Sequence, residues 1–253
     1  MAGNDKKKKL ELTIQSLQDR WGSRAIRRLS AQRAREIAHI PTGFADLDKA
    51  IGIGGLPRGR LSEIVGVPTS GTATLALKTI AQAQAKQSQA IYIDVGHTFD
   101  PDYGARCGLL LNQLLLVRPH NFHQGLAILQ DFILGGDSGV LVFDVPFSSA
   151  AEPGSAETLT RTLDRIMAPL GQTAYVLLFL LTLPPGSPTT PSTAYPNEAT
   201  LPHYAAVRLF VQRQRWLYQA GDIHGYEAQV LVAKNKVGPT GKRVSIAITF
   251  DST

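Results

Sequence analysis

The sequence predicts an α/β fold in which a mostly parallel, twisted sheet carries helices on both faces. Short runs of almost continuously apolar residues alternate with helix-like stretches, as in strands buried on both faces of a doubly wound sheet. One apolar run leads through a glycine-containing turn directly into a helix-like segment. With 253 residues, of which 43% are hydrophobic, the chain is long enough to bury one large core.

The first predicted element is an amphipathic helix over residues 10–20. Leu10, Ile14 and Leu17 recur there at helical spacing and form an apolar face. Residues 1–9 are polar and charged, so we expect them to be disordered. The apolar face of the helix has two explanations: it packs against a partner, or it folds back onto its own subunit.

The core elements follow in alternation. Strands are expected at 61–65, 90–95, 114–117, 139–145 and 174–182. Helices are expected near 73–86, 101–109, 122–134 and 156–168. A later group of alternating apolar runs predicts further strands, which would complete the sheet as hairpins, at about 205–214, 227–234 and 243–250.

The composition indicates a soluble intracellular protein, which we expect in the cytoplasm without membrane contact. A single cysteine, Cys107, excludes an internal disulfide and suits a reducing compartment. The Lys-rich N-terminus is followed by amphipathic rather than continuously apolar sequence, which argues against a secretory signal. The longest apolar run, 175–181, is far shorter than the roughly 20 residues of a membrane span.

The excess positive charge is concentrated at the N-terminus. Residues 1–35 contain ten Lys and Arg against three Asp and Glu, whereas the rest of the chain contains sixteen against seventeen. The cations of this basic arm include Lys6, Lys7, Lys8, Lys9, Arg24, Arg27 and Arg28. Such an arm can bind nucleic-acid phosphates with salt-sensitive affinity, or it can serve only as a solubilising tail with a solvated helix face.

A phosphate-binding loop without its charged residues stands at 66–74, where the sequence is GVPTSGTAT. In the working motif, G-x-x-x-x-G-K-[ST], backbone N–H groups wrap the phosphates, the lysine neutralises them and the hydroxyl holds Mg²⁺. Gly66 and Gly71 have the required spacing, but Thr72 replaces the lysine and Ala73 replaces the hydroxyl residue. Taken alone, these two glycines also fit an ordinary strand-to-helix turn.

The surrounding sequence resembles the bacterial RecA recombinase family over almost the whole chain. The segments that carry the resemblance are, in chain order, IPTG (40–43), LD (47–48), GGLPRGR (54–60), ID (93–94), His97, Asp100 with Pro101, Tyr103, Asp144, YAAVRL (204–209) and VAKNK (232–236). Their order and spacing are nearly those of the family, and GGLPRGR and KNK are each distinctive.

The resemblance implies a RecA-like P-loop NTPase core over residues 37–253, preceded by a basic arm and oligomerisation helix over residues 1–36. RecA packs its N-terminal helix on the neighbouring subunit of the filament, and Leu10, Ile14 and Leu17 would make that contact here. RecA also has a small C-terminal domain beyond the core, and we expect this protein to lack it.

The resemblance also indicates which catalytic groups have been replaced. A family glutamate after the second core strand polarises the attacking water, and the matching residue here is Gly96. A family glutamine that senses the γ-phosphate corresponds to about Thr182. With Thr72 and Ala73, four groups needed for hydrolysis are therefore replaced. Since one such loss typically costs about 10² to 10³ in rate, we expect no ATPase activity, no catalytic residue and no required cofactor.

Other nucleotide-site features are retained and leave room for weak ATP or ADP binding. Asp144 follows an apolar strand, where a carboxylate meets the Mg²⁺ water shell in the family, and Asp100 and Tyr103 match residues that hold and stack adenine. Alternatively, Asp144 caps a strand and Tyr103 belongs to the core. The vestigial site comprises Gly66, Ser70, Gly71, Thr72, Ala73, Thr74, Asp100, Tyr103 and Asp144.

Lys234 and Lys236 match the lysines that reach across the subunit boundary to the neighbour's γ-phosphate in RecA. The resemblance therefore implies a subunit that can serve an active neighbour's ATP although its own site is inactive. The alternative is that both lysines are simply solvated.

The two loops with which RecA holds single-stranded DNA are poorly matched. The first, which follows the central strand, is shortened, and the second, at roughly 183–203, is rich in Pro, Ser and Thr. No Lys or Arg occurs between Arg165 and Arg208, so this loop cannot neutralise phosphates. Any DNA contact is therefore expected from the basic arm and from Arg208, Arg213 and Arg215.

Three functions follow from these observations. In the first, the chain is a non-catalytic RecA paralogue that acts as an accessory or scaffold in DNA repair, recombination or SOS-induced translesion synthesis, resembling the ImuA proteins in role. Alternatively, it is a nucleotide-sensing or inhibitory subunit that caps RecA filaments, or an active recombinase, against which the four replacements argue. We favour the first function, with a RecA-type recombinase or translesion polymerase components as partners, besides single-stranded DNA and further copies of the chain. No metal site is expected, because the six histidines are scattered.

Overall fold

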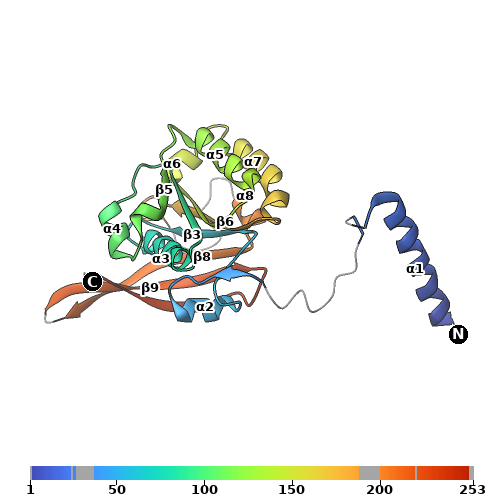
Figure 1. The fold of residues 1–253 in the computed structure, drawn as a ribbon. Helices are drawn as coiled ribbons and strands as arrows, with labels where there is room; N and C mark the ends of the chain where they lie inside the picture. The colour runs from blue at the N-terminus through green and yellow to red at the C-terminus, as the bar shows by residue number, and fades with distance from the viewer. Residues whose placement is uncertain (1, 24, 27–36, 188–199, 220, 251–253) are drawn as a thin grey trace. The chain divides into compact units, whose positions relative to one another are not determined.

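The computed structural model describes residues 2–23, 25–26, 37–187, 200–219 and 221–250 (Figure 1). The chain divides into two compact units, Met1–Ile37 and Ala38–Thr253. Each unit is considered by itself below.

The first unit consists mainly of one helix, α1 (Ala2–Trp21). The predicted helix over 10–20 is confirmed, but the expectation that residues 1–9 are disordered is wrong, because the helix already begins at Ala2. Two properties account for the longer helix: lysine is a good helix former, and Asp5 in the first turn complements the helix dipole.

The second unit contains all the strands and the remaining helices of the described chain. The strands are β1 (His39–Ile40), β2 (Leu56–Pro57), β3 (Arg60–Gly66), β4 (Gln89–Asp94), β5 (Leu114–Val117), β6 (Ser138–Pro146), β7 (Ala174–Thr182), β8 (Val207–Gln219), β9 (Asp222–Asn235) and β10 (Arg243–Thr249). The helices are α2 (Ala45–Ile51), α3 (Thr72–Gln84), α4 (Pro101–Arg106), η2 (Leu111–Gln113), α5 (Phe122–Gly135), α6 (Phe147–Ala150), α7 (Ser155–Leu170) and α8 (Thr200–Tyr204).

Eight strands form one sheet in the order β10-β9-β8-β3-β7-β6-β4-β5. The pairs from β8 to β5 are parallel, whereas β9 runs antiparallel to both β8 and β10. The predicted α/β class with a mostly parallel sheet and helices on both faces is therefore confirmed. Each predicted strand is present, but β8 extends to Gln219, because its polar half continues to pair with β9.

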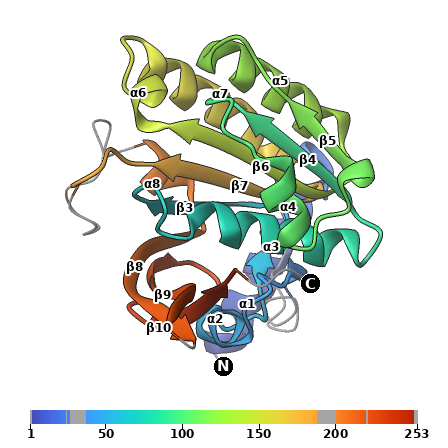
Figure 2. The same cartoon turned by 90° about the vertical axis from the view of Figure 1, so that its left-hand side faces the viewer.

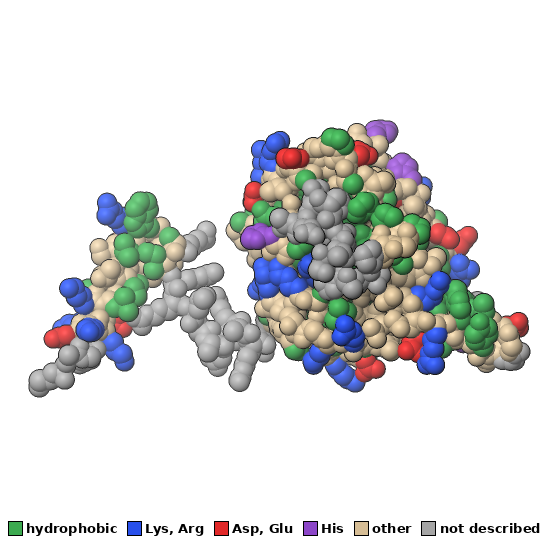
Figure 3. All heavy atoms as spheres, turned by 180° about the vertical axis from the view of Figure 1, so that it is seen from behind, with side chains coloured by type: hydrophobic (Ala, Val, Ile, Leu, Met, Phe, Trp, Pro, Cys, Tyr) green, Lys and Arg blue, Asp and Glu red, His purple; other side chains and the backbone are tan. Residues whose placement is uncertain are grey.

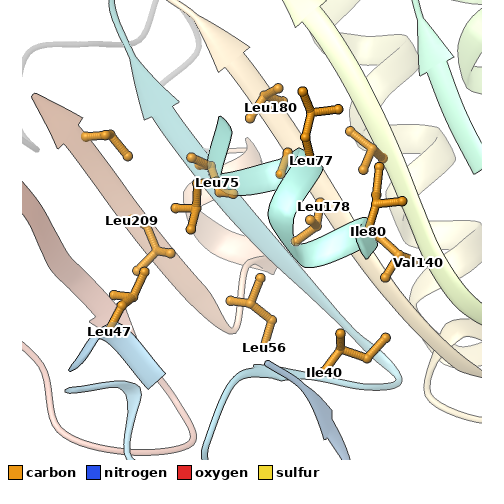
Figure 4. Packing of buried hydrophobic residues seen from close by; sticks show 14 of the residues in the cluster. Ile40, Leu47, Leu56, Leu75, Leu77, Ile80, Val140, Leu178, Leu180 and Leu209 are labelled. Atoms are coloured by element: carbon orange, nitrogen blue, oxygen red, sulfur yellow. The ribbon is translucent and has the colours of Figure 1, made fainter. Parts of the chain in front are cut away.

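Helices cover the two faces of the sheet separately (Figure 2). On one face α3 and α2 pack against alternate strand residues, and Figure 4 shows Leu75 and Ile80 of α3 beside Leu178 and Val140 of the sheet. On the other face α5 and α7 pack against the intervening strand residues. The central strands β3, β4, β6 and β7 are therefore buried almost along their whole length, as the near-continuous apolar runs indicated.

The carboxyl ends of the central strands meet at one edge of the sheet. Gly66 at the end of β3 pairs with Thr182 at the end of β7, and Thr182 pairs with Pro146 at the end of β6. Asp94 and Asp144 are partners across β4 and β6. In open parallel sheets this edge is the usual place of a ligand site.

Candidate functional site

The loop between β3 and α3 can only be formed with glycine at its two ends. A Cβ atom on Gly66 would lie 2.7 Å from the carbonyl oxygen of Val211 in β8. Gly71 has φ 106°, a left-handed conformation that favours glycine, and a Cβ there would lie 2.6 Å from Ile248 Cδ1. The close packing of β8 and β10 against this loop therefore requires both residues.

The inside of the loop is filled by the protein's own side chains. Ser70 and Thr72 are 1% and 6% exposed. Both turn back toward Gly66: the methyl carbon of Thr72 lies 2.7 Å from the position that a Cβ at 66 would take. Ala73, the next residue of α3, is exposed and carries no hydroxyl. The loop thus has the two glycines of a phosphate site, but it has no cation at position 72 and no hydroxyl group at position 73.

The two other replaced positions lie at the same edge of the sheet. Gly96 follows β4, and a Cβ atom there would lie 3.2 Å from Pro146 Cδ, a tight contact. Thr182 ends β7 and is half-buried beside Gly66. The strand ends therefore bring the four positions of the expected replacements to one edge of the sheet.

Asp144 is a buried carboxylate with little to compensate its charge. It is 8% exposed, and its Oδ2 accepts a hydrogen bond of 2.7 Å from the Tyr92 hydroxyl. Burial raises the pKa of Asp144 to about 6, the Tyr92 hydrogen bond opposes that rise, and Asp94 adds to it. Asp94 is better compensated, because it accepts from the backbone N–H groups of Thr98 and Phe99 and pairs with Arg118 at 3.3 Å.

Asp100 and Tyr103 lie at the start of α4, where each makes a structural contact. Asp100 caps the helix, accepting from the backbone N–H groups of Asp102 and Tyr103. The Tyr103 hydroxyl is hydrogen-bonded to Thr74 Oγ1 of α3, and burial raises the pKa of Tyr103 to about 12. The structure thus brings Tyr103 next to the helix that follows the loop.

An aromatic groove runs from this loop along α4. It consists of two adjoining cavities of about 300 and 220 Å³ that share Thr74, Tyr103 and Phe250. Its aromatic lining is Tyr103, Trp216, Tyr226 and Phe250, and its cations are Lys78, Arg106 and Arg213. We use the name aromatic groove for this set of residues. Trp216, Tyr226, Phe250 and Lys78 were not predicted. Trp216 of β8 and Tyr226 of β9 reach the groove through strand pairing that the sequence does not reveal, Phe250 directly follows β10, and Lys78 lies on α3.

Two arginines proposed for DNA contact have different surroundings. Arg208 is only 7% exposed, and its Nε lies 2.5 Å from Oε2 of fully buried Glu63. The expectation that Arg208 contacts DNA is therefore wrong, because the ion pair holds it inside the sheet. Arg213 is exposed: its guanidinium lies 4.3 Å from the centre of the Trp216 ring, and Nη1 donates to Thr69 Oγ1 at 3.3 Å.

Lys234 and Lys236 lie together at the end of β9 and both contact α8. Lys234 Nζ donates to the backbone carbonyls of Pro202 and His203, and Lys236 Nζ donates to that of His203 at 3.4 Å. Partial burial and the neighbouring charge of Lys236 lower the pKa of Lys234. In this conformation the two ammonium groups bind the C-terminal carbonyls of a helix.

The residues proposed for the N-terminal contacts lie partly outside the described chain. Arg24, Arg27 and Arg28 are outside it. On α1, Lys6, Lys7, Lys8 and Lys9 are exposed. Within the same unit Leu10 is 55% exposed, and Ile14 and Leu17 are half-buried. The second proposed DNA loop is described only up to residue 187 and from residue 200 onward.

In the part of the chain that the structure describes, no cluster of three or more His, Cys, Asp or Glu residues could hold a metal ion. None of the helices within the described ranges has the length and apolar character needed to cross a bilayer.

Comparison with known proteins gives consistent matches over the whole chain. Residues 8–253 match the family described as the RecA N-terminal domain. The RecA proteins of Streptomyces avermitilis, Lactobacillus acidophilus and Nocardia farcinica are 32%, 30% and 34% identical to this chain. These alignments cover 99%, 99% and 97% of this chain and 70%, 73% and 75% of the respective relatives.

Replacing Asp144 by Asn should reveal the cost of this buried charge as a pH dependence. The folded-state pKa is raised from 3.8 to about 6, so the stability that the protonated group contributes is present below about pH 4 and is lost as the pH rises through 6. We expect the stability of Asp144→Asn, relative to the wild type, to increase by about 3 kcal/mol across this range. Urea unfolding at a series of pH values measures it.

A Tyr92→Phe variant provides the matched control, because it removes the donor that stabilises the charged carboxylate. Without this hydrogen bond the pKa of Asp144 should rise further, so the stability of the Tyr92→Phe variant should continue to fall up to a higher pH than that of the wild type. If the free energy of unfolding had the same pH dependence in all three proteins, ionisation of Asp144 would not destabilise the fold.

Proposed function

This chain belongs to the RecA family, and we propose that it acts as a non-catalytic accessory or scaffold protein in DNA repair, recombination or damage-induced translesion synthesis, similar in role to the ImuA proteins. The observation that carries the proposal is the loop between β3 and α3. It keeps Gly66 and Gly71, but Thr72 and Ala73 occupy the lysine and hydroxyl positions.

The residues of the loop do not fit a magnesium–triphosphate group. Phosphoryl transfer depends on positioning and on charge stabilisation by the lysine and the metal ion. Here the Thr72 methyl group and Ser70 face Gly66 across the loop. Asp144, which would meet the metal's water shell, is buried with a raised pKa and bonded to Tyr92. These features favour a neutral, closed loop over one that binds a tetra-anionic nucleotide.

The purified protein should hydrolyse no ATP above background, with or without single-stranded DNA. A RecA protein in the same assay serves as the positive control. Thr72→Lys combined with Ala73→Thr should restore nucleotide binding without turnover, because Gly96 and Thr182 still lack the catalytic side chains. DNA-stimulated turnover of the unmodified protein that Asp144→Ala abolishes would contradict the proposal.

Any DNA binding is proposed to depend on the basic arm. Lys6, Lys7, Lys8 and Lys9 are exposed on α1, whereas Arg208 is buried against Glu63. Arg215 is exposed but is paired with Glu227 at 2.7 Å, whereas the exposed Arg213 donates to the Thr69 hydroxyl. Arg213 is therefore the better candidate of the three arginines on β8. A cationic helix attracts phosphates regardless of sequence.

Deleting residues 1–35 should remove single-stranded DNA binding, measured by fluorescence anisotropy over a salt series. Replacing Lys6, Lys7, Lys8 and Lys9 by Gln should lower the salt slope by up to about 3, because each phosphate contact on a single strand contributes about 0.7. Arg213→Gln, which removes an exposed cation of the second unit, is the matched comparison and should change the salt slope less than the four lysine substitutions do. If the truncated protein binds as well as the full chain, the arm is only a solubilising tail.

Association is proposed to use α1, whose apolar residues are unusually exposed. Leu10 is 55% exposed, although an apolar side chain normally gains free energy by burial. A partner subunit, either a second copy or an ATP-competent RecA-type protein, would cover this face. Lys234 and Lys236 would lie at the other contact, where they would serve the neighbour's nucleotide.

Replacing Leu10, Ile14 and Leu17 together by Ser should abolish association without unfolding the core, since α1 belongs to a separate compact unit. Light scattering of the protein alone, and mixed with a RecA-type partner over DNA, measures the result. Gln15→Ser with Asp19→Ser, on the opposite face of the helix, should have no effect. A wild type that stays monomeric in both experiments would contradict the proposal.

A second candidate function, a nucleotide-sensing or inhibitory subunit that caps RecA filaments, is favoured by one observation. Tyr103 lies beside Thr74 at the start of α3, so a stacking position for a base is retained although the phosphate position is filled. Weak ATP or ADP binding that changes association with RecA filaments, measured by titration calorimetry and sedimentation, would favour this function over the first.

A further inference from the structure

The aromatic groove continues onto an exposed apolar surface at the end of the β8–β9 hairpin. Trp216 is 38% exposed, Phe250 45%, Ile223 49% and Tyr218 65%. Hydrophobic side chains gather at this end of the molecule (Figure 3). Single exposed apolar residues are ordinary, but a contiguous set beside a cavity is typical of a binding surface.

The aromatic rings of this surface are already ordered by contact with one another. The Trp216 and Tyr226 rings lie 5.9 Å apart at 81°, and the Phe250 ring lies 5.9 Å from Tyr226 and 6.5 Å from Trp216. Tyr226 is buried and packs against both of the other rings. A ligand that covers Trp216 and Phe250 would therefore lose little conformational entropy in ordering them.

The groove is cationic at both ends. Arg213 lies over Trp216 beside the loop, and Lys78 and Arg106 line the part next to α4. Among the described residues that line the groove, none is Asp or Glu. An occupant with complementary charge would be anionic as well as apolar.

We propose that the aromatic groove binds a short segment of a partner protein in which acidic side chains stand beside large apolar ones. The apolar side chains would cover Trp216 and Phe250, and the carboxylates would pair with Arg213, Lys78 and Arg106. This inference rests on the proposed function in one respect: no nucleotide fills the groove.

A protein segment fits these residues better than a nucleic-acid strand does. A strand needs a row of free cations along its backbone. On the same hairpin Arg215 is bonded to Glu227, and Arg208 is buried against Glu63. The cations of the groove are few and separated by aromatic rings, which suits isolated carboxylates between apolar side chains.

Peptides selected from a random phage-displayed library on the full-length protein would test this proposal. The selected sequences should be enriched in Asp and Glu next to Phe, Trp or Leu. Synthetic versions can be titrated against a Trp21→Phe background, in which Trp216 is the only remaining tryptophan and its fluorescence reports binding. Replacing the acidic residues of a peptide by their amides should weaken binding about tenfold.

Protein variants then locate the site. Phe250→Ser and Arg213→Glu should each weaken peptide binding about tenfold or more, because the first removes apolar contact area and the second turns an attractive charge into a repulsive one. The matched controls Leu115→Ser, an exposed apolar residue on β5, and Arg243→Glu, an exposed cation on β10, should leave it unchanged.

Three results would overturn the proposal. The selected peptides show no enrichment of acidic and apolar residues, or their affinity is unchanged by Phe250→Ser and by Arg213→Glu. The third result is that ATP or a single-stranded oligonucleotide displaces the peptides at a concentration lower than that of the peptide itself. The first two would leave the proposed function intact if ATP hydrolysis is still absent. ATP hydrolysis by the unmodified protein would instead contradict the proposed function, whatever the peptides do.

Discussion

The close approach of the β3–α3 loop to β8 and β10 is the constraint on which the site depends. Gly66 leaves room for the carbonyl oxygen of Val211, and Gly71 leaves room for Ile248 and adopts a conformation that other residues rarely take. Both glycines are thus required by packing within the chain itself, with or without a phosphate. This explains how the loop keeps its shape while Thr72 and Ala73 occupy its chemical positions. The loop therefore keeps the two glycines of the motif, while Thr72 and Ala73 stand at the positions of its lysine and its hydroxyl residue.

The carboxylates at the edge of the sheet show the electrostatic consequence of that replacement. Asp94 is satisfied by two backbone N–H groups and by Arg118, whereas Asp144 has Tyr92 and a neighbouring carboxylate. A loop lysine and a metal ion would normally supply positive charge near such a residue. With Thr72 in that position, burial determines the protonation of Asp144, and the raised pKa follows. The carboxyl group of Asp144 therefore takes up its proton at a higher pH than that of an exposed aspartate.

Local patterns in the sequence were sufficient to predict the eight strands of the sheet and the main helices. The central strands are almost continuously apolar because both of their faces are buried, whereas β9 and β10 alternate between buried and exposed residues. The polar second half of β8 was missed, since only its pairing with β9 defines it as a strand. The same pairing, with its irregularity between Arg213 and Arg215, brings Trp216 opposite Tyr226 and builds the aromatic groove. Arg208 was misjudged for a similar reason: its partner Glu63 is 145 positions away in sequence. Sequence spacing identified the loop and its missing groups, but not the surfaces formed between distant strands.

The two lysines at the end of β9 are the residues that the proposed subunit contact would use. Lys234 and Lys236 donate to the last carbonyls of α8, where cations are favoured by the helix dipole. To reach a neighbour's phosphate they would exchange these neutral carbonyl acceptors for a charged one, so that an ammonium–carbonyl hydrogen bond is replaced by an ion pair. Since Lys234 is half-buried with a lowered pKa, an approaching anion would also stabilise its charged form. In the proposed assembly, a neighbour's nucleotide would therefore compete with the carbonyl groups of α8 for the two lysines.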